Sequence, residues 1–522
     1  MSRDTALLTF SIGPVHAFIA QARRLADLWA GSYLLSHLIR QAVSELRKHG
    51  GEMVFPYLPE KDIPDGIPNR FVCRVEAVAA DEVAGAMARA VQDVLTTYAR
   101  GAALRLRGYF PFETIWSEEE GGRQTDHLLD IAWSWVPEEK GYAEAALAGA
   151  RRFEAVRRFR PFRQSGQPGE KCAICGERTA LPDGDRRHVR DAWERAARDS
   201  EKTDLERFLR LDQTRLCLVC ATKRLLPVAE RRESDFVALD RFQPHDDAPY
   251  LALVKMDGDR MGRMLGLGPE AVRDGDLEAF HREVSRVLTG LAQGLRRTNS
   301  PDLNLAALGG YEPQGQPPQL LYAGGDDVLF VCDPRDALPL VDLLRAHYLE
   351  RFEPVRLRLA GGDPFTVSAA VLFAHPAHPA GLLLHDVEEL LDEVAKERMD
   401  RNAVAIRLAK RGGPPVEVAF RWDDPDQPGW TAALAALIGN VKEGVLTSGQ
   451  TFNLRLEETT LQDTFDSRPE LWKPWLAERL SRNDASGDVK ELAGRIAPFF
   501  IHRRSEALRI ARFLGREVQV RS

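Results

Sequence analysis

The sequence predicts an α+β fold made of four consecutive parts. Three observations predict it: one order of strands and helices occurs twice in the chain, two Cys-x-x-Cys pairs lie between the two occurrences, and the end of the chain shows only helical spacing of Leu, Ala and Ile. We therefore expect two ferredoxin-like palm domains, a zinc-binding insert and a C-terminal helical domain. The expected boundaries are 1–110 for the first palm, 111–245 for the helical and zinc-binding linker, 246–425 for the second palm and 426–522 for the helical domain.

The first palm is expected to begin with an apolar, β-prone strand that ends in a Gly-Pro turn. Its elements are expected in this order: strand and turn at 6–15, an amphipathic stretch at 16–47, strands at 52–57 and 70–76, and a helix at about 81–99.

The second palm repeats this order and contains a hairpin. Its elements are expected as a buried strand at 250–259, a helix at 277–297, a hairpin at 320–331, a helix at 337–352, a strand at 366–373 and a closing helix at about 380–410. Strand, helix, hairpin, helix and strand in this order are typical of a ferredoxin-like palm.

Two adjacent carboxylates stand at the turn of the hairpin, in the run Gly324-Gly325-Asp326-Asp327. The glycines allow the backbone to reverse where a side chain would clash, and they leave room for a bulky anion. Two neighbouring Asp side chains repel each other unless a divalent cation neutralises them. Palm-type polymerases and nucleotide cyclases present metal to a triphosphate in this way. The alternative is an ordinary polar hairpin tip without catalytic function.

A third carboxylate, Asp257, is expected beside this hairpin, because the first strand of a ferredoxin-like sheet lies next to it. Asp257, Asp326 and Asp327 would then converge on one site as catalytic and metal-binding residues. Three hard oxygen ligands suit Mg²⁺ or Mn²⁺, which retain some waters and take substrate phosphates as further ligands. Asp259 is a candidate for nucleotide binding. The alternative is that Asp257 and Asp259 cap the helix that follows them.

Two basic side chains on the closing helix or at its end are candidates for binding the triphosphate. Lys396 would act as a point charge and Arg401 as a fork with several donors. The alternative is that both are solvated helix charges, as most Lys and Arg are.

The first palm lacks the acids of the second. Ser11 falls where Asp257 falls in the later copy, and no Gly-Gly-Asp-Asp run is present. Such a domain can bind a nucleotide, near Ser11 and Gly13, but it cannot hold two metals. A duplication with one metal-binding half fits an enzyme that joins two nucleotides across a pseudo-twofold interface. The alternative is a common superfold that carries no shared function.

Four of the six cysteines form two pairs with the spacing of zinc knuckles: Cys172, Cys175, Cys217 and Cys220. The 41 residues between the pairs require an inserted helical excursion, which the charged, Leu-spaced residues 189–210 can supply. Four thiolates would fill a tetrahedral Zn²⁺ site, so the site is expected to be structural and to pin the insert to the first palm. A disulfide framework is the competing interpretation, and few cysteines and no signal peptide argue against it. Cys73 and Cys332 lie in strand-like runs and are expected to be core thiols.

Arginines alternate with phenylalanines over residues 151–163, just before the first knuckle. This stretch could stack on bases and grip the phosphates of an RNA strand, or it could be a solvated helix face with its phenylalanines turned inward. The whole chain does not favour unaided binding of nucleic acid, because 71 basic and 78 acidic residues leave a net charge of −7. No apolar run reaches membrane length, so we expect a soluble, cytoplasmic protein with no membrane partner.

Four runs of sequence resemble one family: Phe10–Arg24, Asp27–Ser36, Ile67–Phe71, and Met256–Gly262 together with the hairpin. They are similar to the large subunit of type III CRISPR effector complexes, and most similar to its Cmr-type (III-B) branch. The resemblance covers nearly the whole chain. It implies an RNA-guided antiviral complex whose large subunit makes cyclic oligoadenylate second messengers from ATP. It also implies other effector subunits, guide RNA and target RNA as partners, with the acids at Asp326 and Asp327 carrying the metal chemistry.

The chain departs from the family in one respect. Members commonly begin with an HD-type nuclease domain, whereas this sequence begins at the first palm strand, and its His385-Asp386 pair has no neighbouring ligands of the nuclease kind. We therefore do not expect DNA cleavage by this chain. Two other functions stay open: a catalytically silent scaffold for guide and target RNA, and a stand-alone nucleotide cyclase, because Lys396 and Arg401 also resemble the closing motif of GGDEF-type cyclases.

Overall fold

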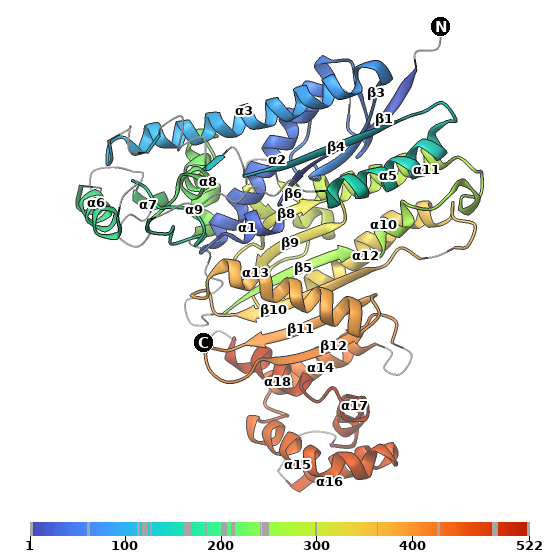
Figure 1. The fold of residues 1–522 in the computed structure, drawn as a ribbon. Coiled ribbons are helices and arrows are strands. Elements are labelled where there is room, and N and C mark those ends of the chain that lie inside the picture. Colours follow the sequence, from blue (N-terminus) through green and yellow to red (C-terminus); the bar gives the residue numbers. More distant parts are fainter. Residues whose placement is uncertain are drawn as a thin grey trace.

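A computed structural model supplies the fold shown in Figure 1. It describes residues 4–59, 63–111, 115–116, 124–125, 128–159, 169–182, 185–199, 206–209, 215–240, 242, 250–297, 300–362, 364–424, 429–482 and 489–518. The two palms lie one above the other, with the cysteine-containing insert to one side and the C-terminal helices beyond the second palm.

The first palm contains a four-stranded sheet with the order β2-β3-β1-β4. Its strands are β1 (Thr5–Gly13), β2 (Glu52–Phe55), β3 (Arg70–Glu76) and β4 (Asp130–Pro137), and its neighbouring strands are antiparallel. This is the ferredoxin-like strand order, so the predicted fold of the first palm is confirmed.

Helices cover both faces of this sheet. Alternate residues of β1, among them Leu8, Phe10 and Ile12, enter a core shared with α2 (Leu25–Lys48) and α3 (Ala80–Leu106). The short helix α1 (His16–Ala20) precedes α2, and α5 (Tyr142–Arg158) packs against β1 and β4. Both faces are therefore buried, which explains why β1 is apolar along nearly its whole length.

The sequence did not reveal β4, which lies inside the range 111–245 that we assigned to the linker. Its register with β1, Leu8 opposite Trp135 and Phe10 opposite Trp133, makes it the fourth strand of the first palm. The first sheet thus extends beyond residue 110. The four domain boundaries remain a prediction, and β4 is the element that a boundary at residue 110 would separate from its sheet.

The second palm contains an eight-stranded sheet with the order β12-β11-β10-β5-β9-β8-β7-β6. Its central strands, β10-β5-β9-β8, repeat the ferredoxin-like order of the first palm. The strands are β5 (Leu251–Gly258), β6 (Arg296–Arg297), β7 (Ser300–Leu303), β8 (Gln319–Gly324), β9 (Asp327–Cys332), β10 (Val367–Ala374), β11 (Ala403–Ala409) and β12 (Val416–Arg421). The prediction of two such palms is therefore confirmed.

The two faces of the second sheet enter different cores. One face packs with α11 (Leu277–Gly294), α12 (Ala337–Arg356) and the C-terminal helices, whereas the other packs with α13 (Ala380–Glu389) and the helices of the first palm. Side chains of a strand alternate between faces. The residues of β5 with odd numbers, which include Leu251 and Leu253, therefore face the first palm.

The predicted closing helix at 380–410 is wrong in its last part. Helix α13 continues as a π-helix, η6 (Leu390–Arg398), and then stops. Three successive residues, Asp400, Arg401 and Asn402, have a positive φ, and β11 follows as a strand parallel to β10. The run that we extended as helix is therefore a buried apolar strand.

The remaining elements form the insert, the C-terminal domain and short connections. The insert contains α6 (Arg186–Asp199), α7 (Glu206–Leu209), α8 (Leu218–Ala229) and α9 (Glu233–Asp240), with α8 packed on α2 and α3. The C-terminal helices are α14 (Trp430–Lys442), α15 (Ser448–Asp466), α16 (Trp472–Arg482), α17 (Val489–Ile501), α18 (Ala507–Arg512) and η8 (Phe513–Glu517). The short helices are η1 (Ala77–Ala79), α10 (Met261–Met264), η4 (Pro269–Ala271), η5 (Leu305–Leu308) and η7 (Pro469–Leu471). Across the described ranges, no helix is both long enough and apolar enough to cross a bilayer.

Candidate functional site

A cavity of about 750 Å³ lies between the two palms. One wall comes from the end of β1 and the start of α1, and the facing wall comes from β5, β8 and β9. Predicted site residues line both walls. They are Ser11 and Gly13 from the first palm, and Asp257, Gly324, Gly325, Asp326 and Asp327 from the second.

The hairpin turn depends on its two glycines. Gly325 has a φ of +65°, in the left-handed region where glycine carries no steric penalty. A Cβ on Gly324 would lie 2.5 Å from the hydroxyl oxygen of Tyr322 and 3.1 Å from the carbonyl oxygen of Gly66. The turn therefore closes without side chains at either position, and Asp326 and Asp327 follow directly.

The register of the sheet brings Asp257 to the same place. Met256 on β5 pairs with Val328 on β9, so Asp257 and Asp327 are the next residues where the two antiparallel strands continue. Both face the first palm, because they share the strand faces of Leu253 and Leu329 respectively. The structure thus brings the three predicted carboxylates to one end of the cavity.

Burial and mutual repulsion disfavour the charged forms of two of these acids. Burial and the charge of Asp257 raise the pKa of Asp326 to about 8. Burial also raises the pKa of Asp327 to about 6, although the neighbouring Lys255 ammonium lowers it in part. Such shifts are common where several carboxylates are held together for a function.

Two lysines lie against these acids. The Lys396 Nζ atom is 2.6 Å from an oxygen of Asp257 and 2.9 Å from one of Asp392. The Lys255 Nζ atom is 2.8 Å from Glu388 Oε1 and 3.6 Å from Asp327 Oδ2. Both ammonium groups therefore balance negative charge at the site.

A further pair of side chains connects the two walls. His16, the first residue of α1, places Nδ1 2.7 Å from Glu388 Oε1 on α13. Sequence reasoning missed His16, Glu388 and Lys255. A signal existed for Lys255, a lone charge in an apolar strand two residues before Asp257 and hence on the same face. No local pattern marks His16 or Glu388, which lie 372 positions apart.

The three acids are candidate ligands of a divalent cation. Oδ1 of Asp327 is buried and accepts no hydrogen bond in the described part of the molecule, which is costly for an oxygen that could ligate an ion. Carboxylate oxygens are the ligand type that Mg²⁺ and Mn²⁺ prefer. Asp257, Asp326 and Asp327 are therefore the residues that would hold such an ion. Among the described residues, however, the cysteine cluster is the group whose ligand atoms all lie within 4.8 Å of one another, and the carboxylates of these acids are more widely spaced.

Asp259 does not reach the cavity, in contrast to our expectation. Its Oδ1 accepts a hydrogen bond from the Ser368 hydroxyl at 2.7 Å, and its Oδ2 accepts from the Thr366 hydroxyl at 2.8 Å and the Asn402 amide at 2.9 Å. Nor does it cap α10, which begins after Arg260 without a side-chain cap. Asp259 instead holds the loop after η6 against β10.

Arg401 lies in that loop with a φ of +68° and is not among the residues that line the cavity. The structure therefore brings Lys396 to the acids but not Arg401. The His385-Asp386 pair on α13 is likewise absent from the cavity lining, and His385 is exposed.

The Arg- and Phe-rich stretch divides between core and cavity. Phe153 is fully buried, with the Arg70 guanidinium 4.5 Å from its ring centroid. Val156, Arg157 and Phe159 line the outer end of the cavity. Residues 160–163 of the predicted RNA-binding stretch lie outside the described residues.

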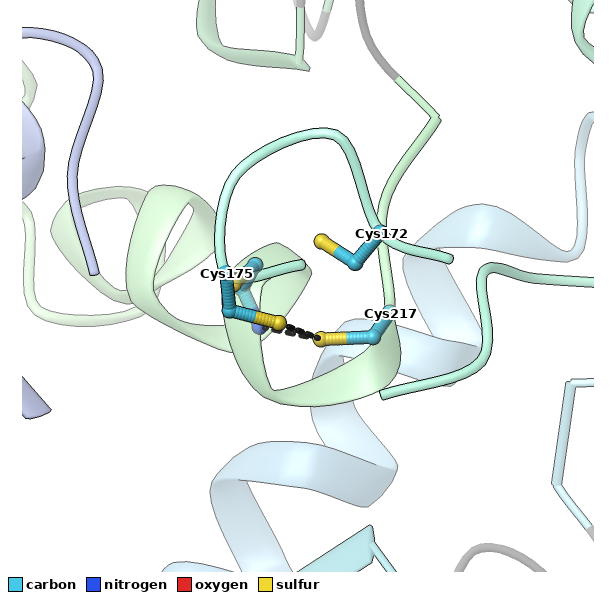
Figure 2. A group of neighbouring side chains, drawn as sticks. Cys172, Cys175 and Cys217 are labelled. Atoms are coloured by element: carbon cyan, nitrogen blue, oxygen red, sulfur yellow. Dashed lines mark hydrogen bonds between the residues drawn. The ribbon is translucent and has the colours of Figure 1, made fainter. Parts of the chain in front are cut away.

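The four paired cysteines form a compact cluster, with their sulfur atoms within 4.8 Å of one another (Figure 2). The Sγ atoms of Cys175 and Cys217 are 3.9 Å apart, and none of the described cysteines forms a disulfide. Gly176 has a φ of +68° just after the first knuckle, which provides its tight turn. Four thiolates within ligand distance suit tetrahedral Zn²⁺, so the cluster is a candidate zinc site. Cys73 and Cys332 are buried.

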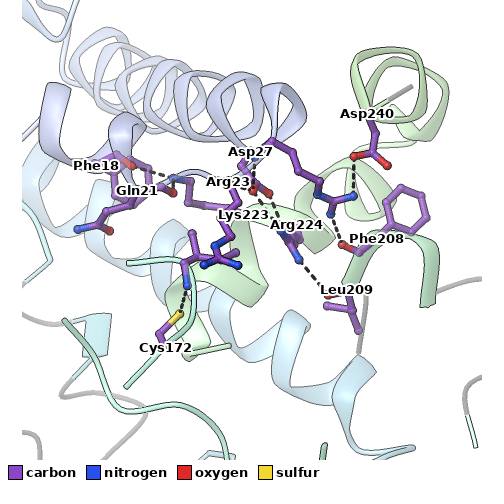
Figure 3. A network of polar contacts seen from close by, with 12 residues as sticks. Phe18, Gln21, Arg23, Asp27, Cys172, Phe208, Leu209, Lys223, Arg224 and Asp240 are labelled. Carbon is purple, nitrogen blue, oxygen red and sulfur yellow. Dashed lines mark hydrogen bonds and ion pairs between the residues drawn. The ribbon is translucent and has the colours of Figure 1, made fainter. Parts of the chain in front are cut away.

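The second knuckle is joined to the wall of the cavity through α8 (Figure 3). The buried Lys223 ammonium donates hydrogen bonds to the carbonyl oxygens of Phe18 at 2.7 Å and Gln21 at 2.9 Å, at the end of α1. The next residue, Arg224, forms a buried ion pair with Asp27 of α2, with Nε 2.8 Å from Oδ1. The insert thus holds the segment that carries His16.

Comparisons with known proteins agree with this architecture. Residues 7–100 match the family model described as the N-terminal domain of CRISPR-associated protein Cmr2, and residues 250–405 match the second palm domain of Cas10/Cmr2. The chain is 23% identical to the CRISPR system Cmr subunit Cmr2 of Pyrococcus furiosus over 570 aligned positions. That match covers 79% of this chain, which spans 62% of the length of that relative.

Two solved structures share the fold. One is a type III-B Cmr-beta complex in the apo state, with a TM-score of 0.60 at 12% identity, covering 93% of this chain and 78% of the other. The second is Cmr-beta bound to cognate target RNA, with a TM-score of 0.58 at 12% identity, covering 93% and 80%. The two palms are therefore similar to the palm and N-terminal domains of Cas10/Cmr2 proteins, and the whole chain shares the fold of the Cmr-beta structures.

Proposed function

We propose that the chain is a metal-dependent nucleotidyltransferase that converts ATP into cyclic oligoadenylate within an RNA-guided effector complex. The observation that carries this proposal is the asymmetry of the cavity. A group of three acids, Asp257, Asp326 and Asp327, lines its second-palm wall, whereas the first-palm wall offers Ser11, Gly13 and His16 with a single carboxylate, Asp130. Such a cavity suits two nucleotides of different roles, one bound through its triphosphate and one presenting a hydroxyl.

The donor nucleotide would lie on the second palm. Asp257, Asp326 and Asp327 would hold Mg²⁺ or Mn²⁺, and the bound ion would neutralise developing charge on the phosphates and lower the pKa of the attacking hydroxyl. Gly324 and Gly325 allow the tight turn that presents Asp326 and Asp327 to the cavity. Lys396 and Lys255 place positive charge beside the carboxylates, where the triphosphate would need it.

The acceptor nucleotide would lie on the first palm, near Ser11 and Gly13. Its 3′-oxygen would attack the α-phosphorus of the donor, and pyrophosphate would leave. The cavity would hold the two nucleotides side by side, and this orientation of the reacting groups would lower the barrier of the step. Repetition followed by ring closure would yield the cyclic product.

The choice of ATP and the partners come from the family resemblance. We propose that guide RNA, target RNA and other effector subunits assemble with this chain, in line with the structural relative solved with cognate target RNA. This assembly would also accommodate the net charge of −7, since the RNA contacts would be shared with basic partners.

A direct assay tests the proposal. The chain, with its complex and matching target RNA, is supplied with labelled ATP and Mg²⁺ or Mn²⁺. We expect cyclic adenylate products, and we expect Asp326→Ala combined with Asp327→Ala to abolish them, because the metal ligands are removed. Asp386→Ala, on α13 and away from the cavity lining, is the matched control and should retain activity. Absence of product under all conditions would favour an RNA scaffold, and product without RNA partners would favour a stand-alone cyclase.

A further inference from the structure

An imidazole and a carboxylate meet between the two palms at the cavity. His16 begins α1 of the first palm, and Glu388 lies near the end of α13 of the second, with Nδ1 and Oε1 2.7 Å apart. Both residues line the cavity. A histidine whose Nδ1 is fixed by a carboxylate has a defined tautomer, with the proton on Nδ1 and a free electron pair on Nε2.

The position of His16 places this nitrogen where an acceptor nucleotide would lie. His16 follows Gly13 by three residues on the first-palm wall, and 68% of its side chain is exposed. The described contacts of the ring use Nδ1, so Nε2 is left for a group in the cavity. His16 is also the single histidine among the described residues that line this cavity.

Charged groups from three elements surround the ring. Glu388 on α13 contacts it directly, Lys255 on β5 donates to the same Glu388 oxygen at 2.8 Å, and Asp327 on β9 lies 3.6 Å from Lys255. The bond to Glu388 raises the pKa of His16 above its ordinary value, while burial and the Lys255 charge oppose that rise. A carboxylate partner that raises the pKa of an imidazole also makes it a stronger base, which favours acceptance of a proton.

We propose that His16 accepts the proton of the acceptor's 3′-hydroxyl through Nε2, with Glu388 as the residue that positions the ring. This inference rests on the proposed function. In the step, the 3′-oxygen forms a bond to the donor's α-phosphorus, the bond from that phosphorus to the β-phosphate bridging oxygen breaks, and pyrophosphate leaves with the electron pair. The hydroxyl proton moves to Nε2, and Glu388 stabilises the resulting imidazolium before the proton passes to water.

The other charged groups at the cavity are less suited to this task. Asp257, Asp326 and Asp327 are the candidate metal ligands, and the two lysines are held as cations by the carboxylates that they contact. The pKa of Lys396 is raised, although its burial opposes this, because Asp257 and Asp392 stabilise the ammonium. A neutral imidazole, by contrast, has a free electron pair on the ring nitrogen that does not contact Glu388.

Three variants of the full chain are compared with the wild type, each assembled with its complex and target RNA. The rate of product formation from labelled ATP and Mg²⁺ is measured at pH values from about 5.5 to 9. For His16→Gln we expect kcat to fall roughly 100-fold, with loss of the acidic limb of the pH profile. For Glu388→Gln we expect that limb to move to lower pH, because the carboxylate that raises the imidazole pKa is gone. His385→Gln, an exposed histidine on α13, is the matched control and should keep the wild-type profile.

Two further measurements separate proton transfer from a structural role. His16→Gln should bind ATP with an unchanged Kd and unfold at an unchanged temperature, because the side chain is largely exposed. His16→Ala should regain activity when imidazole is added, since a free base can fill the space that the ring leaves.

Several results would overturn the inference. His16 would not be the proton acceptor if His16→Gln kept the acidic limb of the wild-type pH profile. The same conclusion would follow if weaker ATP binding alone explained its loss of activity. Either result would leave the proposed function intact. A wild-type complex that makes no product under any condition would overturn the proposed function and this inference together.

Discussion

Gly258 controls how closely Asp326 can approach β5. A Cβ at this position would lie 2.8 Å from the Asp326 Cβ, 3.0 Å from its Oδ2 and 2.7 Å from the Tyr348 hydroxyl oxygen. Real Cβ atoms do not tolerate such distances, so the absence of a side chain allows the carboxylate of the turn to sit against the strand that carries Asp257.

We therefore expect Gly258→Ala to displace Asp326 and to lower nucleotidyltransferase activity roughly 100-fold, because a shift of about 1 Å at reacting groups has effects of this size. The measurement is product formation with labelled ATP alongside the unfolding temperature. Gly262→Ala is the matched control, since a Cβ there meets no atom within 4 Å. Equal activity of the two variants would show that Asp326 does not depend on this close packing.

Side chains that are grouped by their spacing in the sequence could be predicted to lie together, whereas side chains that meet through contacts between distant segments could not. The Gly-Gly-Asp-Asp run and the four cysteines were visible as local patterns, and the structure brings each set together. The Asp259 carboxylate accepts hydrogen bonds from Thr366, Ser368 and Asn402, which are far away in the sequence, so no local pattern could show that it lies outside the cavity lining. The contact between His16 and Glu388 could not be predicted for the same reason.

Among the secondary-structure elements, α8 links the cysteine cluster to the cavity wall. Its first turn carries Cys220, and the next turn presents Lys223 to α1 and Arg224 to α2. The buried Lys223 ammonium donates hydrogen bonds to two carbonyl oxygens at the end of α1. These bonds take the place of the water molecules to which the carbonyl oxygens would otherwise be bonded. A bound metal would fix the start of α8, and hence these contacts.

Zinc content provides a test at this scale. We expect about one Zn²⁺ per chain in intact protein, falling to near zero in Cys175→Ser, which removes one of four thiolate ligands. The unfolding temperature should fall with it, because metal binding stabilises only the folded cluster. Elemental analysis and thermal unfolding are the measurements. Cys73→Ser, at a buried thiol outside the cluster, should keep its zinc, and intact protein with far less than one equivalent would exclude the four-thiolate site.

The sequence did not reveal β4, β6, β7, β11 and β12, and two of these strands, β11 and β4, show the reason. We extended the closing helix through residues 403–409, whereas the left-handed turn at 400–402 ends the helix and β11 begins. β4 was missed because its aromatic run stands alone, and its role appears only through pairing with β1. Both strands owe their conformation to a partner strand that a local pattern does not reveal.

At the scale of the whole molecule, the cavity exists because the two palms face each other across a shared core. Alternation along β5 and β9 turns Lys255, Asp257 and Asp327 toward the first palm, while the opposite faces pack on α11, α12 and the C-terminal helices. The duplicated order of elements was enough to predict two palms. The way in which they pack, and therefore the composition of the cavity, required the structure.

The proposed function requires that the second-palm carboxylates bind a divalent cation opposite the nucleotide wall of the first palm. Binding of Mn²⁺ to the full chain, followed by electron paramagnetic resonance at pH 6 and pH 8, tests it most directly. A carboxyl with a raised pKa keeps its proton to a higher pH, and a metal must displace that proton. Since the pKa of Asp326 is raised to about 8 and that of Asp327 to about 6, affinity should increase from pH 6 to pH 8.

Asp326→Asn should weaken Mn²⁺ binding at pH 8 at least about tenfold and reduce its pH dependence. Asp386→Asn, outside the cavity lining, should bind as the wild type does. Affinity that is the same in all three proteins, or that does not change between the two pH values, would contradict a metal site built on these acids.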